Sequence, residues 1–272
     1  MSDSLRPIVW KRQLISTRSD WSLIATALSS TNISDTYGKY SDFIQNNCFP
    51  DLYIFQKKKT LHSILKIGCA FDYIKSKDTL LEKVSTERLL HLICILYYVF
   101  ENESQSLASI LTIVKKRPIW SFLSTNPDMP LTEEQEWLQR QPNVAREYFQ
   151  SLNSQLIPSL ISNQPDLSKM LFQLNISPLH LLSLTMPTIF SNQLRLEIVI
   201  RLIDIWSFEG EGFILRVWLA LLEKVKWKMK CNKKATVVNI FTSNQWSGYL
   251  EVGSSQEFLK LVRDVLRRKK NV

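Results

Sequence analysis

Residues 201–223 read RLIDIWSFEGEGFILRVWLALLE, in which two apolar stretches flank the glycines Gly210 and Gly212. The apolar residues on both sides recur with helical spacing. Glycine is scarce in this chain, with 6 in 272 residues, so two glycines at this point indicate a sharp backbone turn. A phosphate-binding loop, a catalytic turn and a corner between two helices would each use such a turn.

The chemistry of the flanking residues decides among these three. Glu209 and Glu211 would repel a phosphate, and no Lys-Ser or Lys-Thr pair follows them as in a nucleotide-binding loop. The chain also contains no GxSxG and no HExxH motif. We therefore interpret the turn as a corner, with a helix over 194–208 ending and a helix over 213–228 beginning, because glycine accepts the positive φ that helix termination requires.

The whole chain predicts an all-α fold. Apolar residues make up 45% and charged residues 22% of the sequence, which is a globular composition. Helical spacing recurs, as in Leu61, Ile64, Leu65 and Gly68, whereas only residues 235–241 have strand-like composition. No repeat or Gly/Ser linker divides the chain, so we predict a single multi-helix domain over 1–272, with a short basic tail at 267–272.

Local signals predict where helices begin and end. Capping boxes, in which a hydroxyl and a carboxyl or amide side chain satisfy the first backbone N–H groups, predict helix starts at 79–82, 132–135 and 254–257. Prolines predict breaks at 49–50, 126–130, 141–143, 164–166 and 186–187. At the glycine corner we expect Phe208 and Phe213 to pack beneath the turn.

The net charge of +9 and the pI near 9.3 concern partners rather than fold. Nucleic acid is the weakest option, because the chain has no Arg/Gly-rich tract and no aromatic RNA-binding motif. The lysine stretches 57–59 and Lys224 to Lys234 are interpreted as solvated faces. Docking of either stretch to an acidic partner or to an anionic membrane surface stays open.

Cysteine usage and hydropathy indicate a cytoplasmic protein. The 4 cysteines are widely spaced without a CxxC pair, and Cys69 and Cys94 lie in apolar surroundings typical of buried free thiols. The longest apolar run, 89–100, is shorter than the roughly 20 residues that span a bilayer. Peripheral association with a vacuolar or lysosomal membrane is an alternative that the sequence leaves open.

The histidines argue against metal and acid–base chemistry. His62, His91 and His180 lie in leucine-rich segments, with no carboxylate or cysteine at metal-ligand spacing. Each is interpreted as a partly buried, hydrogen-bonded side chain. We expect no metal site and no cofactor.

Segment 194–223 resembles the C-terminal part of a TBC domain, the helical module of Rab GTPase-activating proteins. In that family a helix ending in an Arg-Ile-Trp-Asp-like run meets a Glu-Gly turn and then a Phe-Arg-Val-Ala-Leu-like helix. The matching positions are Arg201, Asp204, Phe208, Glu209, Gly210, Leu215, Arg216, Val217 and Leu219. Residues 5–14 (LRPIVWKRQL) and the stretch from Phe49-Pro50 through 61–73 are similar to the family's opening and second motifs, in the same order.

The two catalytic motifs of the family are missing here. Active TBC domains carry an arginine in IxxDxxR, which stabilises transition-state charge on the GTP phosphates, and a glutamine in YxQ, which orients the attacking water. Alignment on Pro50 places Ser41, Ile44 and Asn47 at the Ile, Asp and Arg positions, and no YxQ follows Asp72. Since an arginine finger contributes roughly 10³–10⁵ in rate, the resemblance implies an inactive pseudo-GAP with Asn47 at the finger position.

A short TBC protein without either finger is most similar to the small TBC-domain subunit of the tuberous sclerosis complex. That resemblance implies binding to the coiled-coil scaffold of such a complex, alongside a Rheb-type GAP subunit that acts in TOR signalling. An amphipathic helix of the scaffold would lie in a groove, and the candidate partner-binding residues are Tyr97, Tyr98 and Trp120, because Tyr and Trp are favoured at interfaces.

Two other functions stay open at this stage. The chain could be an active Rab GTPase-activating protein that contacts a small GTPase through non-standard fingers, with Arg88 or Arg117 as the arginine and Gln45 or Gln105 as the glutamine. It could also be a membrane- or RNA-binding helical domain that acts through the Lys224 to Lys234 stretch.

Overall fold

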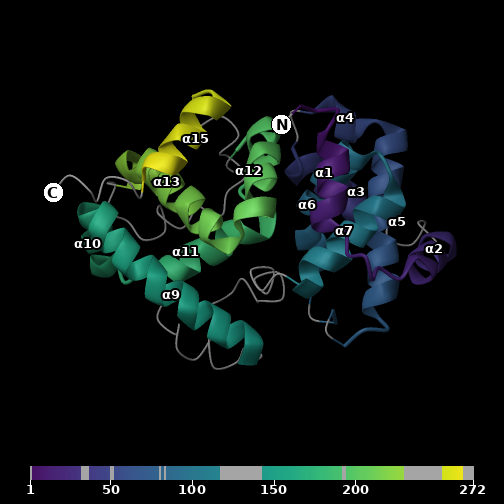
Figure 1. The fold of residues 1–272 in the computed structure, drawn as a ribbon, viewed down its shortest axis with the longest axis horizontal. Coiled ribbons are helices and arrows are strands. Elements are labelled where there is room, and N and C mark those ends of the chain that lie inside the picture. Colours follow the sequence, from purple (N-terminus) through teal and green to yellow (C-terminus); the bar gives the residue numbers. More distant parts are fainter. Residues whose placement is uncertain are drawn as a thin grey trace. The chain divides into compact units, whose positions relative to one another are not determined.

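The computed structural model describes residues 2–31, 37–49, 52–79, 81–82, 84–116, 143–191, 194–229 and 253–265. Every regular element in these ranges is a helix, which confirms the predicted all-α fold (Figure 1). The strand-like segment 235–241 and the basic tail 267–272 lie outside the described residues.

The chain divides into two compact units, each built from two separate stretches of sequence. Unit 1 comprises residues 1–125 and 187–208, and unit 2 comprises residues 126–186 and 209–272. This division concerns compactness alone, so a single TBC-like domain over 1–272 stays a prediction.

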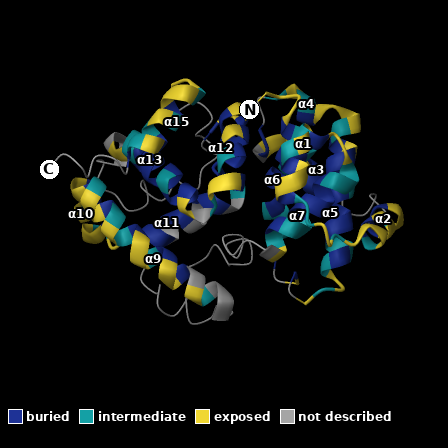
Figure 2. Cartoon of the chain, viewed as in Figure 1, coloured by how far each residue is buried: buried dark blue, intermediate teal, exposed yellow. Residues whose placement is uncertain are grey.

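Unit 1 is organised around two long apolar helices, α5 and α6. Its helices are α1 (Arg6–Leu14), α2 (Trp21–Ser30), α3 (Tyr37–Asn47), α4 (Tyr53–Gln56), α5 (Lys58–Lys75), α6 (Thr86–Phe100), α7 (Glu103–Lys116) and most of α12 (Leu196–Glu209). Helices α5, α6 and α7 pack against one another, and α2 packs on α5 and α7. The buried faces of α5 and α6 appear dark blue in Figure 2.

The predicted apolar stripes form this core. Leu61, Ile64, Leu65 and Gly68 are all buried on α5. On α6 the buried face includes Leu89, Leu92, Ile93, Leu96 and Phe100, as expected from their spacing. Burying a leucine or isoleucine side chain stabilises the fold by about 1.5–3 kcal/mol, so these two helices contribute substantially to the stability of unit 1.

Unit 2 contains α9 (Asn143–Asn163), α10 (Pro165–Gln173), α11 (Pro178–Thr185), α13 (Glu211–Met229) and α15 (Ser255–Asp264). Helix α9 packs on α10 and α11, and α13 packs on α15. The side chain of Gln164, just before α10, donates a 2.7 Å hydrogen bond from Nε2 to the Leu219 carbonyl oxygen of α13. Helix α9 also contains Pro158, which the sequence analysis did not identify as a helical residue.

The structure places a corner at the glycine pair. Helix α12 ends at Glu209 and α13 begins at Glu211, while Gly210 between them has a φ of 75°. The expectation that Phe208 and Phe213 pack beneath the turn is correct for one residue and wrong for the other. Phe213 is buried, but Phe208 is 61% exposed and does not pack beneath the turn. Phe208 follows the buried Trp206 and Ser207 on α12, so the helical rotation of about 100° per residue carries it away from the core.

Of the three helix starts predicted from capping boxes, one is confirmed, one is wrong and one lies outside the described residues. Ser254 and Glu257 form the complete capping box of α15, as predicted. The predicted start at 79–82 is wrong, because helix α6 begins only at Thr86. Leu81 and Val84 are 1% and 4% exposed, and they reach the core through successive hydrogen-bonded turns. The start predicted at 132–135 lies outside the described residues.

The proline breaks agree with the structure where they are described. Helix α10 begins at Pro165, and α11 ends at Thr185, just before a short 3₁₀ helix at Met186–Thr188. The breaks at 126–130 and at residues 141 and 142 lie outside the described residues. Within the described part of the chain, none of the helices is both long enough and apolar enough to cross a bilayer.

Candidate functional site

The position expected for the arginine finger lies at the C-terminal end of α3. Asn47 is the last residue of this helix, and its side chain lies outside the described residues. Cys48 and Phe49 follow, and Phe49 has a φ of 52°. Ile44, at the position where the family has an aspartate, is fully buried, so an apolar side chain anchors the finger segment.

An aromatic cluster around His91 lies next to this segment. The ring of Phe43 meets the His91 ring edge-to-face at 5.8 Å between centroids, and the ring of Phe49 does so at 6.5 Å. His91 Nδ1 is 2.7 Å from the hydroxyl oxygen of Ser191. Burial lowers the pKa of His91 to about 4, so the imidazole is neutral at physiological pH.

The histidines whose side chains the structure describes, His62 and His91, differ in their burial. His91 is buried and hydrogen-bonded, as predicted. His62 is exposed, so the expectation of partial burial is wrong for this residue, which lies on the solvent face of α5. The side chain of His180 lies outside the described residues. No group of three metal-ligating side chains occurs in the ranges that the structure describes.

Two buried thiols stand beside the cluster. Burial, followed by a contact with the Cys94 thiol, raises the pKa of Cys48 well above its ordinary value. Cys48, Cys69 and Cys94 are buried free cysteines, which agrees with the sequence analysis. Because the thiolate is the nucleophilic form, a thiol with a raised pKa is a poor nucleophile.

Asp72 anchors the segment where the glutamine motif would follow. The hydroxyl of Tyr40 donates a 2.9 Å hydrogen bond to Oδ2 of Asp72, and the hydroxyl of Thr86 donates to Oδ1. Burial, together with this bond to Asp72, raises the pKa of Tyr40. The carboxylate of Asp72 therefore ties α3 to the beginning of α6 and acts as a structural acceptor.

A buried ion pair joins two of the segments that resemble the TBC family. The guanidinium of Arg6 donates from Nε and Nη2 to the Asp204 carboxylate, at 3.0 Å each. The indole N–H of Trp10 donates to the same carboxylate at 2.8 Å, and Asp3 accepts from Nη1 of Arg6. Arg6 is thus fully engaged in structure and is not available as a substitute finger.

The predicted partner-binding residues do not all lie at the surface. Tyr98 on α6 is 42% exposed, whereas its neighbour Tyr97 is half-buried, and Trp120 lies outside the described residues. Tyr53 on α4 is 71% exposed and is not among the partner-binding residues predicted from the sequence. No motif singles out Tyr53; only its exposure in the folded chain identifies it.

The alternative finger residues are spread over several elements. Gln45 is exposed on α3, Arg88 is half-buried on α6, and Gln105 is half-buried on α7. Arg117 lies outside the described residues. In the Lys224 to Lys234 stretch, the described Lys226 forms an ion pair with Glu223 at 2.5 Å, and residues 230–234 lie outside the described residues.

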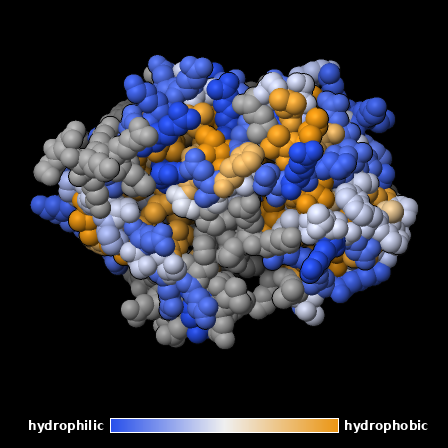
Figure 3. All heavy atoms as spheres, in the orientation of Figure 1, coloured by the Kyte–Doolittle hydropathy of each residue, from blue (hydrophilic) through white to orange (hydrophobic). Residues whose placement is uncertain are grey.

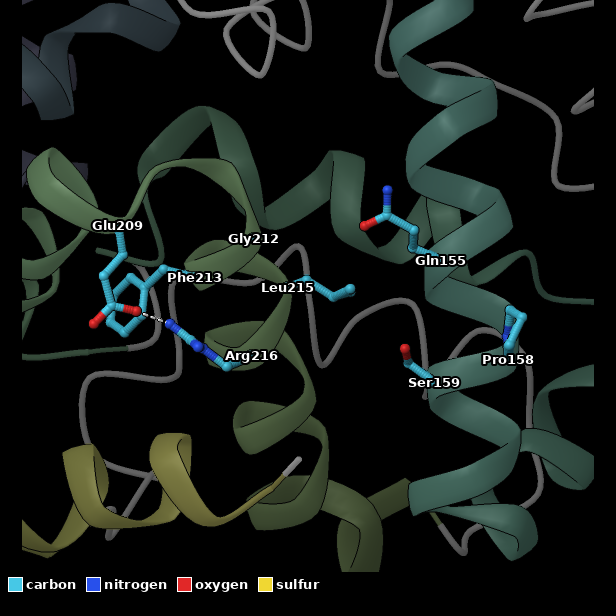
Figure 4. Close-up of a pocket in the computed structure, with 8 residues that line it drawn as sticks. All are labelled: Gln155, Pro158, Ser159, Glu209, Gly212, Phe213, Leu215 and Arg216. Atoms are coloured by element: carbon cyan, nitrogen blue, oxygen red, sulfur yellow. Dashed lines mark hydrogen bonds and ion pairs between the residues drawn. The ribbon is translucent and has the colours of Figure 1, made fainter. Parts of the chain in front are cut away.

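Unit 2 contains a cavity of about 510 Å³ between α9 and α13. Figure 4 shows Gln155 and Ser159 of α9 on one side of it, with Arg216 of α13 directed toward Glu209. The Arg216 guanidinium pairs with the Glu209 carboxylate and lies 5.4 Å above the Phe213 ring. This ion pair therefore adds no net charge to the lining of the cavity.

Comparison with known proteins supports a TBC-type fold. The family model described as the RabGAP TBC domain matches residues 138–266, just under half of the chain. The TBC domain of a flagellar RabGAP from Chlamydomonas has a similar structure, with a TM-score of 0.64 and 12% sequence identity over 97% of this chain and 80% of that chain. No curated protein matches the sequence.

These two matches agree with the resemblance at residues 194–223, which lie within the matched segment. At 12% identity the structural similarity shows the fold alone. Together they support a TBC-domain family for this chain.

Proposed function

We propose that this chain is a catalytically inactive TBC-domain subunit of a tuberous sclerosis-type complex. It would bind the coiled-coil scaffold of that complex and stabilise it, and so support the inactivation of Rheb by a separate GAP subunit and the negative regulation of TOR signalling. The TBC-domain similarity supports the module. The resemblance of a short TBC protein without either finger to the small subunit of that complex motivates the partners.

The proposal depends on Asn47, which alignment of the sequence on Pro50 assigns to the position of the arginine finger. The described side chains next to it are apolar or neutral: Ile44 is buried, and the imidazole of His91 is uncharged at physiological pH. Asn47 carries no positive charge to offset the negative charge that develops on the GTP phosphates, and loss of the arginine costs roughly 10³–10⁵ in rate.

A GTPase assay tests the inactivity. The purified full chain is mixed with a panel of GTP-loaded Rab proteins and with GTP-loaded Rheb, and phosphate release is followed. We expect no acceleration over the intrinsic rates. A hundredfold acceleration that a single Arg→Ala change abolishes would overturn the proposal.

Affinity purification from native cells tests the proposed assembly. We expect the chain to recover a large coiled-coil protein together with a Rheb-type GAP subunit. Recovery of a Rab protein alone, or of the chain by itself, would contradict the proposed assembly.

An active Rab GAP is the second candidate, because the similar solved structure is that of a RabGAP TBC domain. In that case Arg88, the alternative arginine that lies within the described residues, would supply the positive charge. An Arg88→Ala change would then abolish any acceleration, while Arg12→Ala, on the exposed face of α1, would serve as the control.

A further inference from the structure

Two tyrosines near the finger segment are exposed to solvent. Tyr53 begins α4 and is 71% exposed, and Tyr98 near the end of α6 is 42% exposed. The Tyr98 ring lies 6.2 Å from the ring of Phe55, a buried residue of α4, the same helix that Tyr53 begins. Large rings left in water contribute little to folding, and tyrosine is enriched at the hot spots of protein interfaces.

The base beneath these tyrosines is well packed. The ring of Phe55 stacks on Phe49 at 5.7 Å between centroids, and Phe49 in turn meets the ring of His91. This continuous aromatic packing holds α4 against α6. Because Tyr98 packs on Phe55, a partner that binds Tyr98 loses little side-chain entropy, and preorganisation of this kind raises affinity.

Three consecutive lysines flank the tyrosines. Lys57, Lys58 and Lys59 are exposed, and Lys57 Nζ lies 5.8 Å from the centroid of the Tyr53 ring. Lys58 and Lys59 are the first two residues of α5, whose first turn has no acidic residue. Positive charge at a helix N-terminus opposes the helix dipole, so folding alone does not favour these lysines here.

We propose that Tyr53, Tyr98 and Lys57–Lys59, here termed the tyrosine–lysine surface, dock an acidic amphipathic helix of a partner protein. The proposal rests on the partner-binding function proposed above, and it names the surface and the charge of the helix. The apolar face of the helix would cover the two rings, and its carboxylates would pair with the lysines and with the positive end of α5.

Charge and composition favour a helix over a lipid surface. Polybasic membrane sites typically carry about four to eight lysines or arginines, and each contributes about 1 kcal/mol near an anionic surface. The tyrosine–lysine surface has fewer basic residues, which lie beside two aromatic rings of the kind enriched at protein interfaces. Figure 3 shows hydrophobic and hydrophilic atoms side by side on the visible face of unit 1.

The test measures binding of two labelled helical peptides to the full chain. Both peptides carry a leucine face; one has glutamate flanks and the other has lysine at the same positions. We expect the acidic peptide to bind more tightly than the basic one and to weaken as salt is raised.

The variants locate the binding site. The double change Tyr53→Ala and Tyr98→Ala, and separately the triple change Lys57→Glu, Lys58→Glu and Lys59→Glu, should each weaken the acidic peptide at least about tenfold. Trp21→Ala is the matched control, because Trp21 on α2 is 45% exposed in the same unit. Circular dichroism of each variant verifies that it is folded, and the charge reversal leaves the aromatic packing intact.

Equal affinity for the two peptides, or unchanged affinity in both variants, would overturn the proposal. The proposal would also be overturned if vesicles of anionic lipid bound the wild-type chain but not the triple variant, and the acidic peptide did not bind. Recovery of the scaffold from native cells separates this proposal from the proposed function. If wild type and both variants recover the scaffold equally well, the tyrosine–lysine surface is not the docking site, but the proposed assembly stands. If the acidic peptide binds as expected but no scaffold is recovered, the proposed assembly is wrong, but the docking surface stands.

Discussion

At the scale of single residues, the carboxylate of Asp204 is a buried charge in unit 1 whose stability depends on its hydrogen-bond partners. It accepts hydrogen bonds from the Arg6 guanidinium and from the Trp10 indole, and both partners are almost fully buried. A buried charge is tolerated only when its partner is present, because desolvation costs several kcal/mol per ion. The Arg6–Asp204 ion pair thus holds α1 against α12, although the two helices are far apart in the sequence.

Replacing Asp204 by alanine should therefore be strongly destabilising. The change leaves the Arg6 charge buried with only Asp3 to accept from it, and we expect a loss of about 3 kcal/mol in the free energy of unfolding. Urea denaturation measures this loss. Asp3→Ala is the control, with an expected cost below about 1 kcal/mol, because the Asp3 side chain is 97% exposed. Similar costs for the two variants would contradict the assigned role of Asp204.

His91 makes stability depend on pH. The folded imidazole has a pKa of about 4, below its ordinary value of 6.5, because burial disfavours the charged form. The unfolded chain therefore binds the proton more readily, and stability falls as the pH drops from about 6.5 to about 4, by up to about 3 kcal/mol. Below about pH 4 this contribution no longer changes.

Urea denaturation between pH 7 and pH 4 checks this prediction. A His91→Phe variant should show a shallower decline in stability than wild type, since it has no imidazole to protonate at this position. His62→Gln is the matched control, because His62 is exposed on α5, and its pH profile should follow that of wild type. Parallel profiles for His91→Phe and wild type would contradict the assignment.

At the scale of elements, the two glycines of the α12–α13 corner have different roles. Gly210 has a φ of 75°, which side-chain-bearing residues rarely adopt, whereas Gly212 lies in the first turn of α13 with nothing near the position of an added Cβ. The backbone at Gly210 ends one helix and lets the next begin. Gly212 only occupies a helical position that alanine would fill more favourably.

Alanine substitutions should separate these roles. Gly210→Ala forces a left-handed conformation on alanine and should cost about 1–2 kcal/mol of stability. Gly212→Ala should be neutral or should stabilise the protein by up to about 1 kcal/mol, because alanine favours the helix. Thermal unfolding of the two variants gives the comparison. Equal shifts of the same sign would contradict this account of the corner.

At the scale of the whole molecule, the two units are interleaved along the chain. Residues 187–208, which carry Asp204, belong to unit 1 but connect the two sequence stretches of unit 2. Neither unit is therefore formed by one continuous stretch of the chain. If unit 1 unfolds, the stretches of unit 2 become joined by a released linker, and closing that loop costs entropy.

We therefore expect unfolding to be cooperative across the two units. In hydrogen exchange with mass spectrometry, Asp204→Ala should lower the protection of the α13 backbone in unit 2 as well as that of α5 in unit 1. Asp3→Ala should change neither. Protection of α13 that remains at the wild-type level in Asp204→Ala would show that the units unfold independently, against the predicted single domain.

The sequence by itself determined the elements and their pattern. Apolar spacing and prolines predict the buried faces of α5 and α6, the beginning of α10 and the corner at Gly210, because these depend on local sterics and on periodicity along one helix. The resemblance to the TBC family predicts Asn47 at the finger position, and this stays a prediction. The helix start predicted at 79–82 is wrong, because the backbone there forms hydrogen-bonded turns, such as that from Leu81 N–H to the Asp78 carbonyl oxygen.

Only the tertiary structure decided which distant residues meet and which remain exposed. The Arg6–Asp204 pair, the burial that neutralises His91, and the exposure of Tyr53 and Phe208 each depend on how the helices pack. Packing sets the surroundings of a side chain through residues far away in the sequence, and helical periodicity does not contain that information. For this reason the sequence predicted Tyr98 but missed Tyr53, and the proposed docking surface follows from the fold.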